Sequence, residues 1–291
     1  MFRQKRTRGE QAFNVFNHIL LLGIALLCLL PYITIISKSI SDNAYVVSGQ
    51  IGLWPKGFHL NAYQVLLSGS NFRTAFMNSV YITVLGTLLT VFFTAVVGYA
   101  AAKQDLPGRK AINLLYIFTM LFNGGIIPTY LVIKETGLIN NLFVLFIPSL
   151  VTAFNLIVVR SYFESLPPAL EESARIDGAG NLRILFKIIL PISLPSLATI
   201  AIFSAVGIWN NYMGPLMYLT KKDVQVLPLF LQNIVSSADG ANMESTAGMD
   251  AIASETFRAA AIVVSTLPIL MIYPFLQRFF VQGMTLGAVK Q

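Results

Sequence analysis

Long apolar stretches, separated by short polar ones, run along most of the chain. Several are about 20 residues long, the length at which a helix crosses a bilayer. Barrel strands would be about ten residues long and would alternate in hydrophobicity, so the run length predicts helices. The pattern therefore predicts an all-α, polytopic membrane protein with six transmembrane helices. The predicted spans are about 14–37, 76–102, 111–133, 142–160, 192–218 and 259–281.

The composition agrees with lipid as the solvent for most of the surface. The 291 residues are 55% hydrophobic and 11% charged, whereas a soluble domain has about 25% charged residues. So few charges do not cover a water-facing surface. The one cysteine, Cys28, lies in an apolar run, so we expect a packing role for it and no disulfide framework.

The first apolar stretch follows a basic N-terminus, as it would in a signal peptide. However, the run from about residue 19 to residue 36 is long enough to span, and the "SKSISDN" after it contains no small-residue cleavage site. We therefore expect a retained first helix.

The distribution of charge predicts the orientation. If the N-terminus is cytoplasmic, the predicted inner segments hold 13 Lys and Arg residues and the outer segments hold 7, while acidic residues number 6 inside and 7 outside. Cytoplasmic loops of membrane proteins carry such an excess of Lys and Arg. The net charge of +7 is thus a topology signal rather than a nucleic-acid-binding one, and it predicts that both termini are cytoplasmic.

The predicted spans and loops divide the chain into three parts. Residues 1–75 hold the N-terminal segment, the first helix and the first outer loop, residues 76–281 form a five-helix core, and residues 282–291 are a cytoplasmic tail. A second outer loop, 219–258, is either a disordered connector or a surface for an external partner. No internal repeat is evident, so inverted-repeat transporter folds have no support.

One charged segment, 161–191, interrupts the core between the fourth and fifth spans, on the cytoplasmic side. Pro167 and Pro168 suit the first turn of a helix. Glu171 and Glu172 then lie near the N-terminus of that helix, where negative charges interact favourably with the helix dipole. Asp177-Gly178 signals a turn. A second amphipathic stretch follows. The segment therefore predicts two short helices joined by a tight turn at the inner face of the membrane.

The spacing in this segment resembles that of the permease subunits of ATP-binding-cassette (ABC) importers. Their pattern, Glu-Ala-Ala, three residues, Gly, nine residues and Ile-x-Leu-Pro, reads here as Glu172-Ser173-Ala174, then Gly178, then Ile188-Ile189-Leu190-Pro191. Ser173 departs from the usual Ala. The resemblance implies a coupling helix that docks into a groove on a cytoplasmic ATPase, as opposed to a merely solvated loop. The residues it assigns to this contact are Glu171, Glu172, Ser173, Ala174, Asp177, Gly178 and Ala179.

Other stretches resemble one branch of these permeases. "GIWNNYMGPLMYLT" at 207–220 is similar to carbohydrate-type permeases, and "FFVQGMTLGAVKQ" at 279–291 is similar to the tail of the maltose-type second permease. "FNGGIIPTYLVIKETGLINN" at 122–141 resembles the branch for complex oligosaccharides such as alginate or aldouronate fragments. The maltose-type tail reaches between two ATPase subunits, which implies ATPase contacts for Gly287, Ala288, Val289 and Lys290.

The chain lacks the residues needed to supply its own energy. It has no GxxxxGK[ST] phosphate-binding loop, so ATP and Mg are expected on partner subunits, and this chain is expected to bind no cofactor or metal. Charged residues are absent from the centres of the predicted spans, which argues against a proton or sodium relay. A neutral path suits a sugar.

Polar and aromatic residues within the spans are the candidates for that path. A buried Asn needs a hydrogen-bond partner, and the alternative is that each Asn joins two helices. For the aromatic residues, the alternative is a belt at the membrane interface. The candidates are Asn123, Asn155, Trp209, Asn210, Asn211 and Tyr212.

Taken together, the resemblance implies a multi-pass subunit in a bacterial cytoplasmic membrane that imports sugars, with oligosaccharides as the expected substrates, by alternating access. It implies a second permease, two ATPase subunits and an external sugar-binding protein as partners. Alternatives are a permease for peptides or amino acids, a secondary carrier, and a membrane-embedded enzyme. The enzyme alternative is weak because His18 and His59 are the only histidines and no catalytic or metal-binding constellation can be drawn from them.

Overall fold

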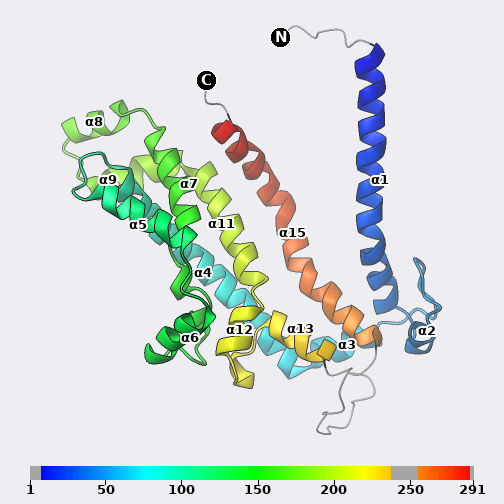
Figure 1. Ribbon diagram of the computed structural model, residues 1–291. Coiled ribbons are helices and arrows are strands. Elements are labelled where there is room, and N and C mark those ends of the chain that lie inside the picture. Colours follow the sequence, from blue (N-terminus) through cyan, green and yellow to red (C-terminus); the bar gives the residue numbers. More distant parts are fainter. Residues whose placement is uncertain (1–7, 237–254, 289–291) are drawn as a thin grey trace. The chain divides into compact units, whose positions relative to one another are not determined.

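The computed structural model describes residues 8–236 and 255–288, with side chains described as far as residue 272 in the last helix. Within these residues every regular element is a helix, which confirms the all-α class (Figure 1). The helices are α1 (Arg8–Ser39), α2 (Asn43–Val47), α3 (Asn61–Ser68), α4 (Ser70–Ala102), α5 (Arg109–Leu121), α6 (Ile126–Glu135), η1 (Leu142–Leu145), η2 (Ile147–Ser149), α7 (Ala153–Glu164), α8 (Ala169–Ile176), α9 (Asn181–Ile184), η3 (Leu185–Ile189), α10 (Leu190–Ile192), α11 (Leu194–Trp209), α12 (Met213–Tyr218), η4 (Lys222–Val224), α13 (Leu227–Ser236) and α15 (Glu255–Ala288).

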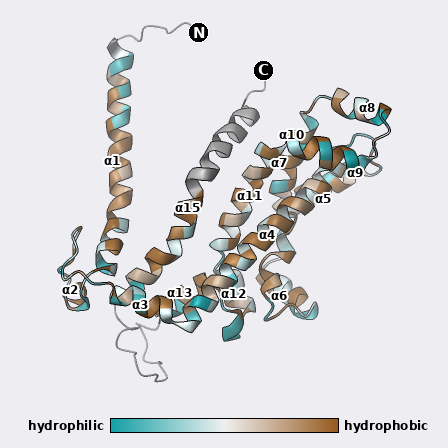
Figure 2. Cartoon of the chain, turned by 180° about the vertical axis from the view of Figure 1, so that it is seen from behind, coloured by the Kyte–Doolittle hydropathy of each residue, from teal (hydrophilic) through white to brown (hydrophobic). Residues whose placement is uncertain are grey.

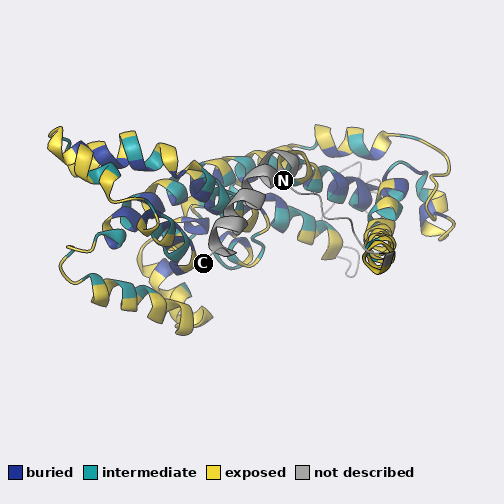
Figure 3. Cartoon of the chain, turned by 90° about the horizontal axis from the view of Figure 1, so that it is seen from above, coloured by how far each residue is buried: buried dark blue, intermediate teal, exposed yellow. Residues whose placement is uncertain are grey.

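The chain forms two compact units. The first comprises residues 1–69 and 233–266, and the second comprises residues 70–232 and 267–291. In the first unit, α1 is apolar over most of its length, with hydrophilic residues toward its N-terminal end (Figure 2), and its residues are exposed along most of the helix (Figure 3). A helix that is hydrophobic all round is stable where lipid or protein covers it.

Hydroxyl groups organise the C-terminal end of α1. Ser39 Oγ lies 2.7 Å from Tyr63 Oη of α3, and Ser41 Oγ donates to the Ser37 carbonyl at 2.6 Å. The amide of Lys56 in turn donates to Ser41 Oγ at 3.1 Å. These bonds satisfy backbone groups that have no helical partner, and they give residues 37–63 a defined path.

The second unit is built around α4, which packs along α7 and α11. Small residues line the buried side of α4 and allow the backbones to approach closely. A Cβ added at Gly98 would lie 3.0 Å from Val159 Cγ1 of α7, and one added at Gly86 would lie 3.0 Å from Phe146 Cβ. Two clusters of buried side chains result, one around Val159 and Ile184 and the other around Phe146 and Leu219.

The spans are less regular than the run lengths predict. Three helices, Gly9–Ser39, Ser70–Ala102 and Glu255–Ile272, are long and apolar enough to cross a membrane. Three helix pairs also pass this test of length and composition, and they are bent by 119° between α5 and α6, by 49° between η2 and α7, and by 81° between α10 and α11. Six spans result if each bent pair crosses once, so the count of six stays a prediction.

Glycine and proline explain the breaks, which run length alone does not reveal. Gly125, between α5 and α6, has a φ of +88°, a conformation that favours glycine. Pro148 lies in the short η2 helix before the second break, and Pro191 and Pro195 flank the third. Proline removes a backbone donor and clashes with the preceding turn, so a helix kinks or stops there.

Candidate functional site

Helix α8 lies in the predicted coupling segment and has two different faces. It begins directly after Pro168, and its first turn carries Glu171 and Glu172, as the sequence predicts. Ala174 on the inner side is only 7% exposed and belongs to the buried cluster around Val159. Ile176 on the outer side is 86% exposed. One face therefore packs on the chain itself, and the other remains available.

The end of α8 is a Schellman cap. The Gly178 amide donates to the Arg175 carbonyl at 3.0 Å, and the Ala179 amide donates to the Ala174 carbonyl at 2.9 Å. Gly178 has a φ of +73°, the left-handed conformation that this cap needs. A Cβ at Gly178 would meet no atom within 4 Å. Gly178 is thus required by the backbone conformation and not by lack of space.

The two acidic residues of α8 differ in their surroundings. Glu171 forms an ion pair with Lys103, which follows the end of α4, and its carboxylate also lies 3.9 Å from Arg175 Nη2. Glu172 is exposed and forms no ion pair with another described residue. Ser173 and Asp177 are also exposed, while Ala179 is half-buried against the cluster that contains Ala174. The assigned set therefore divides into an inward and an outward group.

The second half of the coupling segment runs across the direction of the fifth span. Residues 181–192 form α9, the π-helical η3 and α10, and this helix lies at 81° to α11. Ile184, Leu185 and Ile189 are buried, whereas Arg183 and Lys187 are exposed. Leu182 and Phe186 are exposed as well, so the outward face mixes basic and apolar side chains, as in a helix at a membrane surface.

A second ionic cluster lies where α7 ends. Glu164 accepts a hydrogen bond from Arg160 Nε at 2.9 Å and another from Arg109 at the start of α5. Burial raises the pKa of Glu164, but the hydrogen bonds and charges of Arg160 and Arg109 together outweigh it and hold this pKa below its ordinary value. The cluster joins α5 to α7 beside the coupling segment.

A polar cavity of about 240 Å³ lies between α4, α7 and α11. It brings together two of the predicted path residues, Asn155 and Asn211. Asn155 is buried, and its Nδ2 donates to Ser204 Oγ at 3.3 Å. No charged side chain is among the lining residues, which are Thr90, Leu145, Ser149, Thr152, Asn155, Phe203, Ser204, Gly207, Ile208 and Asn211.

The other predicted path residues lie elsewhere. Trp209 is buried and packs edge-to-face on Phe76, with ring centroids 6.1 Å apart. Tyr212 packs against the cluster around Phe146, and Asn210 is the exposed cap residue at the end of α11. Asn123 accepts from the Gly125 amide at 2.8 Å and shapes the break between α5 and α6. None of these four lines the polar cavity.

Sequence analysis missed the hydroxyl groups of the cavity. Thr152 lies three residues before Asn155, and Ser204 and Gly207 are spaced at i and i+3 along α11, which ends two residues before Asn211. Residues at these spacings share one face of a helix. The signal was therefore present in the sequence, although nothing in it indicated that the two faces meet.

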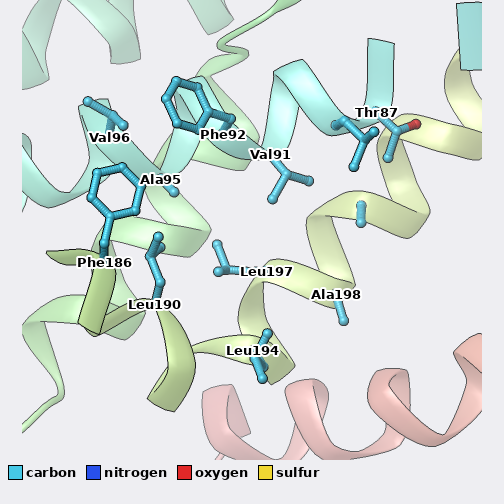
Figure 4. Close-up of a pocket in the computed structure, with 12 residues that line it drawn as sticks. Thr87, Val91, Phe92, Ala95, Val96, Phe186, Leu190, Leu194, Leu197 and Ala198 are labelled. Carbon is cyan, nitrogen blue, oxygen red and sulfur yellow. The ribbon is translucent and has the colours of Figure 1, made fainter. Parts of the chain in front are cut away.

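A second cavity, of about 390 Å³, lies between α4, η3, α10 and α11 (Figure 4). Its lining is apolar apart from Thr87 and includes Val91, Phe92, Phe186 and Leu197. Such a surface offers a sugar hydroxyl almost no hydrogen-bond partner. The smaller polar cavity is therefore the better candidate for a sugar path.

The predicted C-terminal contacts are only partly within the described residues. Gly287 and Ala288 belong to α15, but their side chains are not described. Val289 and Lys290 lie outside the described residues, as does much of the second outer loop.

Comparisons with known proteins show the family of the chain and agree with its fold. Residues 94–286 match the family described as "Binding-protein-dependent transport system inner membrane component". The chain is 40% identical to the polygalacturonan/rhamnogalacturonan transport system permease protein YtcP of Bacillus subtilis, over 97% of this chain and 99% of that protein. It is 30% identical to the arabinooligosaccharides transport system permease protein AraQ of Halalkalibacterium halodurans, over 92% of this chain and 93% of that protein.

A solved structure is similar over almost the whole chain. It is the crystal structure of a bacterial ABC transporter involved in the import of the acidic polysaccharide alginate, and one of its chains aligns with a TM-score of 0.87 and 34% identity, covering 95% of this chain and 99% of that chain. Both the sequence and the fold thus agree with the resemblance seen in the coupling segment. The chain belongs to the family of inner membrane components of binding-protein-dependent transport systems.

Proposed function

We propose that the chain is a membrane-spanning permease subunit of an ATP-driven importer of oligosaccharides. The observation that carries this proposal is the two-sided geometry of α8. Its inner face, with Ala174 and Glu171, is fastened to the chain itself, while Glu172 and Ile176 remain exposed. A short helix presented in this way can enter a groove on a partner. We assign that partner as a cytoplasmic ATPase subunit.

The outward group of the coupling segment makes the contact. Glu172 pairs with a basic residue of the ATPase, and Ser173 and Asp177 flank it. Ala174, Gly178 and Ala179 act indirectly, since they fix the end of the helix and hold it on the body of the permease. The tail residues Gly287, Ala288, Val289 and Lys290 add a second contact with the ATPase pair. ATP and Mg are bound by the ATPase subunits, and this chain binds no cofactor.

The polar cavity forms part of the sugar path. Amide and hydroxyl groups satisfy sugar hydroxyls, and an aromatic ring such as Phe203 offers an apolar surface to a pyranose face. Asn155 and Asn211 are the path residues that we retain. Asn123, Asn210, Trp209 and Tyr212 support the helices around the path. The similar proteins are named for the transport of polygalacturonan, arabino-oligosaccharides and alginate. These names support oligosaccharides as the substrate class.

The assembly follows from the same proposal. The chain crosses the cytoplasmic membrane six times with both termini in the cytoplasm, as the Lys and Arg distribution indicates. A second permease, two ATPase subunits and an external sugar-binding protein complete the importer. When the two ATPase subunits bind ATP and close together, they move the coupling helices and open the path outward to receive sugar. ATP hydrolysis then returns the path to its inward-open state.

The test is a reconstituted complex, purified through a tag on this chain and placed in liposomes with the external binding protein. We expect uptake of at least one labelled oligosaccharide from a panel of oligogalacturonide, alginate oligosaccharide and arabino-oligosaccharide, and none of a peptide control. Glu172→Lys should lower ATPase stimulation by the loaded binding protein at least about tenfold, since a reversed charge at a contact costs 1.4 kcal/mol or more. Unchanged stimulation and uptake would overturn the assignment of α8.

A further inference from the structure

The ion pair between Lys103 and Glu171 links the coupling helix to the longest helix of the second unit. Lys103 directly follows Ala102, the last residue of α4, and Glu171 lies in the first turn of α8. Their side chains are 18% and 26% exposed, so the pair is partly sheltered from water. Among the described residues it is the one ion pair between α8 and the rest of the chain.

Lys103 is held from a second side by an aromatic ring. Its Nζ lies 4.2 Å from the centroid of the Tyr99 ring, one turn earlier in the sequence. Tyr99 is buried and packs edge-to-face on Phe163 of α7, with centroids 6.3 Å apart. A cation held by both a carboxylate and a ring face has a restricted position. Glu171 is therefore bound to a fixed point of the helix bundle.

The apolar attachment of α8 is small by comparison. Ala174 and, beyond the cap, Ala179 are the side chains through which α8 and its turn join the buried cluster, and each offers a single methyl group. Burial of one methyl group removes little apolar surface from water and stabilises only weakly. A partly buried ion pair is costly to break, because removal of one partner leaves the other charge uncompensated. The pair is thus a directional attachment of α8 to the end of α4, in addition to these two small apolar contacts.

The helix at the other end of this link reaches the polar cavity. Thr90 of α4 lines the cavity, and α4 packs along both α7 and α11, which supply Asn155 and Ser204 to the same lining. A displacement of α8 that is passed to Lys103 therefore acts on the helix that forms one wall of the proposed sugar path.

We propose that the Lys103–Glu171 pair is the positioning link that transmits movement of α8 to α4, and that it sets how much sugar is carried per ATP hydrolysed. The inference rests on the proposed function, since it requires α8 to be the helix that the ATPase moves. Glu171 is accordingly a transmitting residue that faces its own chain, and Glu172 alone of the two carboxylates faces the ATPase. Lys103, which lies outside the coupling segment, becomes part of the coupling machinery.

The experiment measures oligogalacturonide uptake and ATPase rate in the same liposomes and takes their ratio. Lys103→Glu and Glu171→Lys should each lower sugar carried per ATP by about fivefold or more, the usual size of a coupling between sites. The double swap, Lys103→Glu with Glu171→Lys, should recover most of the ratio. If a charge reversal prevents assembly of the complex, Glu171→Gln replaces it as the test, because glutamine keeps the shape of the side chain and removes its charge. Arg160→Gln is the matched control, because it breaks an ion pair within α7 that does not reach α8.

The outcomes separate this inference from the proposed function. If Glu172→Lys abolishes stimulation but the Lys103 and Glu171 variants keep a normal ratio, the transmitting link is wrong and the ATPase contact stands. If the single variants lose the ratio and the swap does not recover it, although the complex assembles and melts as the wild type does, the pair is not the link. If Glu172→Lys leaves stimulation and uptake unchanged, the assignment of α8 as the ATPase contact fails, and if the wild-type complex takes up no oligosaccharide, the proposed function itself fails.

Discussion

Glu171 and Glu172 are adjacent in sequence, yet their carboxylates have different surroundings. Glu171 pairs with Lys103 of the same chain, and Glu172 is exposed without an ion-pair partner among the described residues. Neighbouring positions of a helix differ by about 100° around its axis, so one of the two can face the bundle while the other faces away. This division gives the two carboxylates different roles and allows them to be tested separately.

Ile176 is expected to be an apolar anchor for the ATPase. It is 86% exposed at the end of α8, the helix that we assign to the ATPase contact, and a few apolar anchors commonly carry much of the binding energy of an interface. Ile176→Asp should lower binding-protein-stimulated ATPase activity about tenfold without lowering the melting temperature of the purified permease. Ile184→Asp is the contrasting change, because Ile184 is fully buried and an unpaired charge there should destabilise the fold itself. Equal effects of both on melting would contradict the prediction.

Gly178 is expected to be needed for its backbone conformation. Gly178→Ala places a side chain at a φ of +73° and should cost about 1–2 kcal/mol, because alanine disfavours that conformation. Gly180 is the control, since its φ is −74° and neither added Cβ would meet an atom within 4 Å. Gly180→Ala should leave melting and coupling unchanged, and Gly178→Asn should retain more coupling than Gly178→Ala. Melting curves and stimulated ATPase rates of the three variants provide the comparison.

Gly207 offers a way to fill the polar cavity without a steric penalty. It lines the cavity, and a Cβ there would meet no atom within 4 Å. Gly207→Leu should therefore leave the fold intact and reduce oligosaccharide uptake by about tenfold or more, equivalent to 1.4 kcal/mol. Gly86→Leu is the same substitution at a packed site, where the Cβ would lie 3.0 Å from Phe146 Cβ, and it should instead lower the melting temperature. Normal uptake by Gly207→Leu would exclude this cavity from the path.

Asn140 is expected to hold the segment after α12 in place by hydrogen bonds. It has a φ of +58°, and its Oδ1 accepts from the amides of Thr220 and Lys221 at 2.7 and 3.1 Å. Asn140→Gly removes these bonds but tolerates the conformation, whereas Asn140→Ala removes the bonds and adds strain of about 1–2 kcal/mol. Asn140→Ala should therefore destabilise more than Asn140→Gly. Hydrogen exchange at the Thr220 and Lys221 amides should accelerate in both variants.

Local features of this protein could be predicted from its sequence. Apolar run length indicated helices, Pro168 indicated where α8 begins, and Asp177-Gly178 indicated its turn. Each of these is decided by a few consecutive residues, because helix formation, capping and φ preference act within one or two turns. The family could be identified for the same reason, since its motif lies within a single segment.

The tertiary structure alone decided which of these residues work together. Run length did not predict the bend of 119° between α5 and α6. Of the six predicted path residues, Asn155 and Asn211 line the polar cavity, and the other four lie outside it. The cavity exists because polar faces of α4, α7 and α11 meet. The partner of Glu171 is likewise decided by tertiary structure, since Lys103 lies 68 residues earlier in the chain, directly after the end of α4. Contacts over such distances arise from the packing of whole helices, which no local pattern of residues specifies.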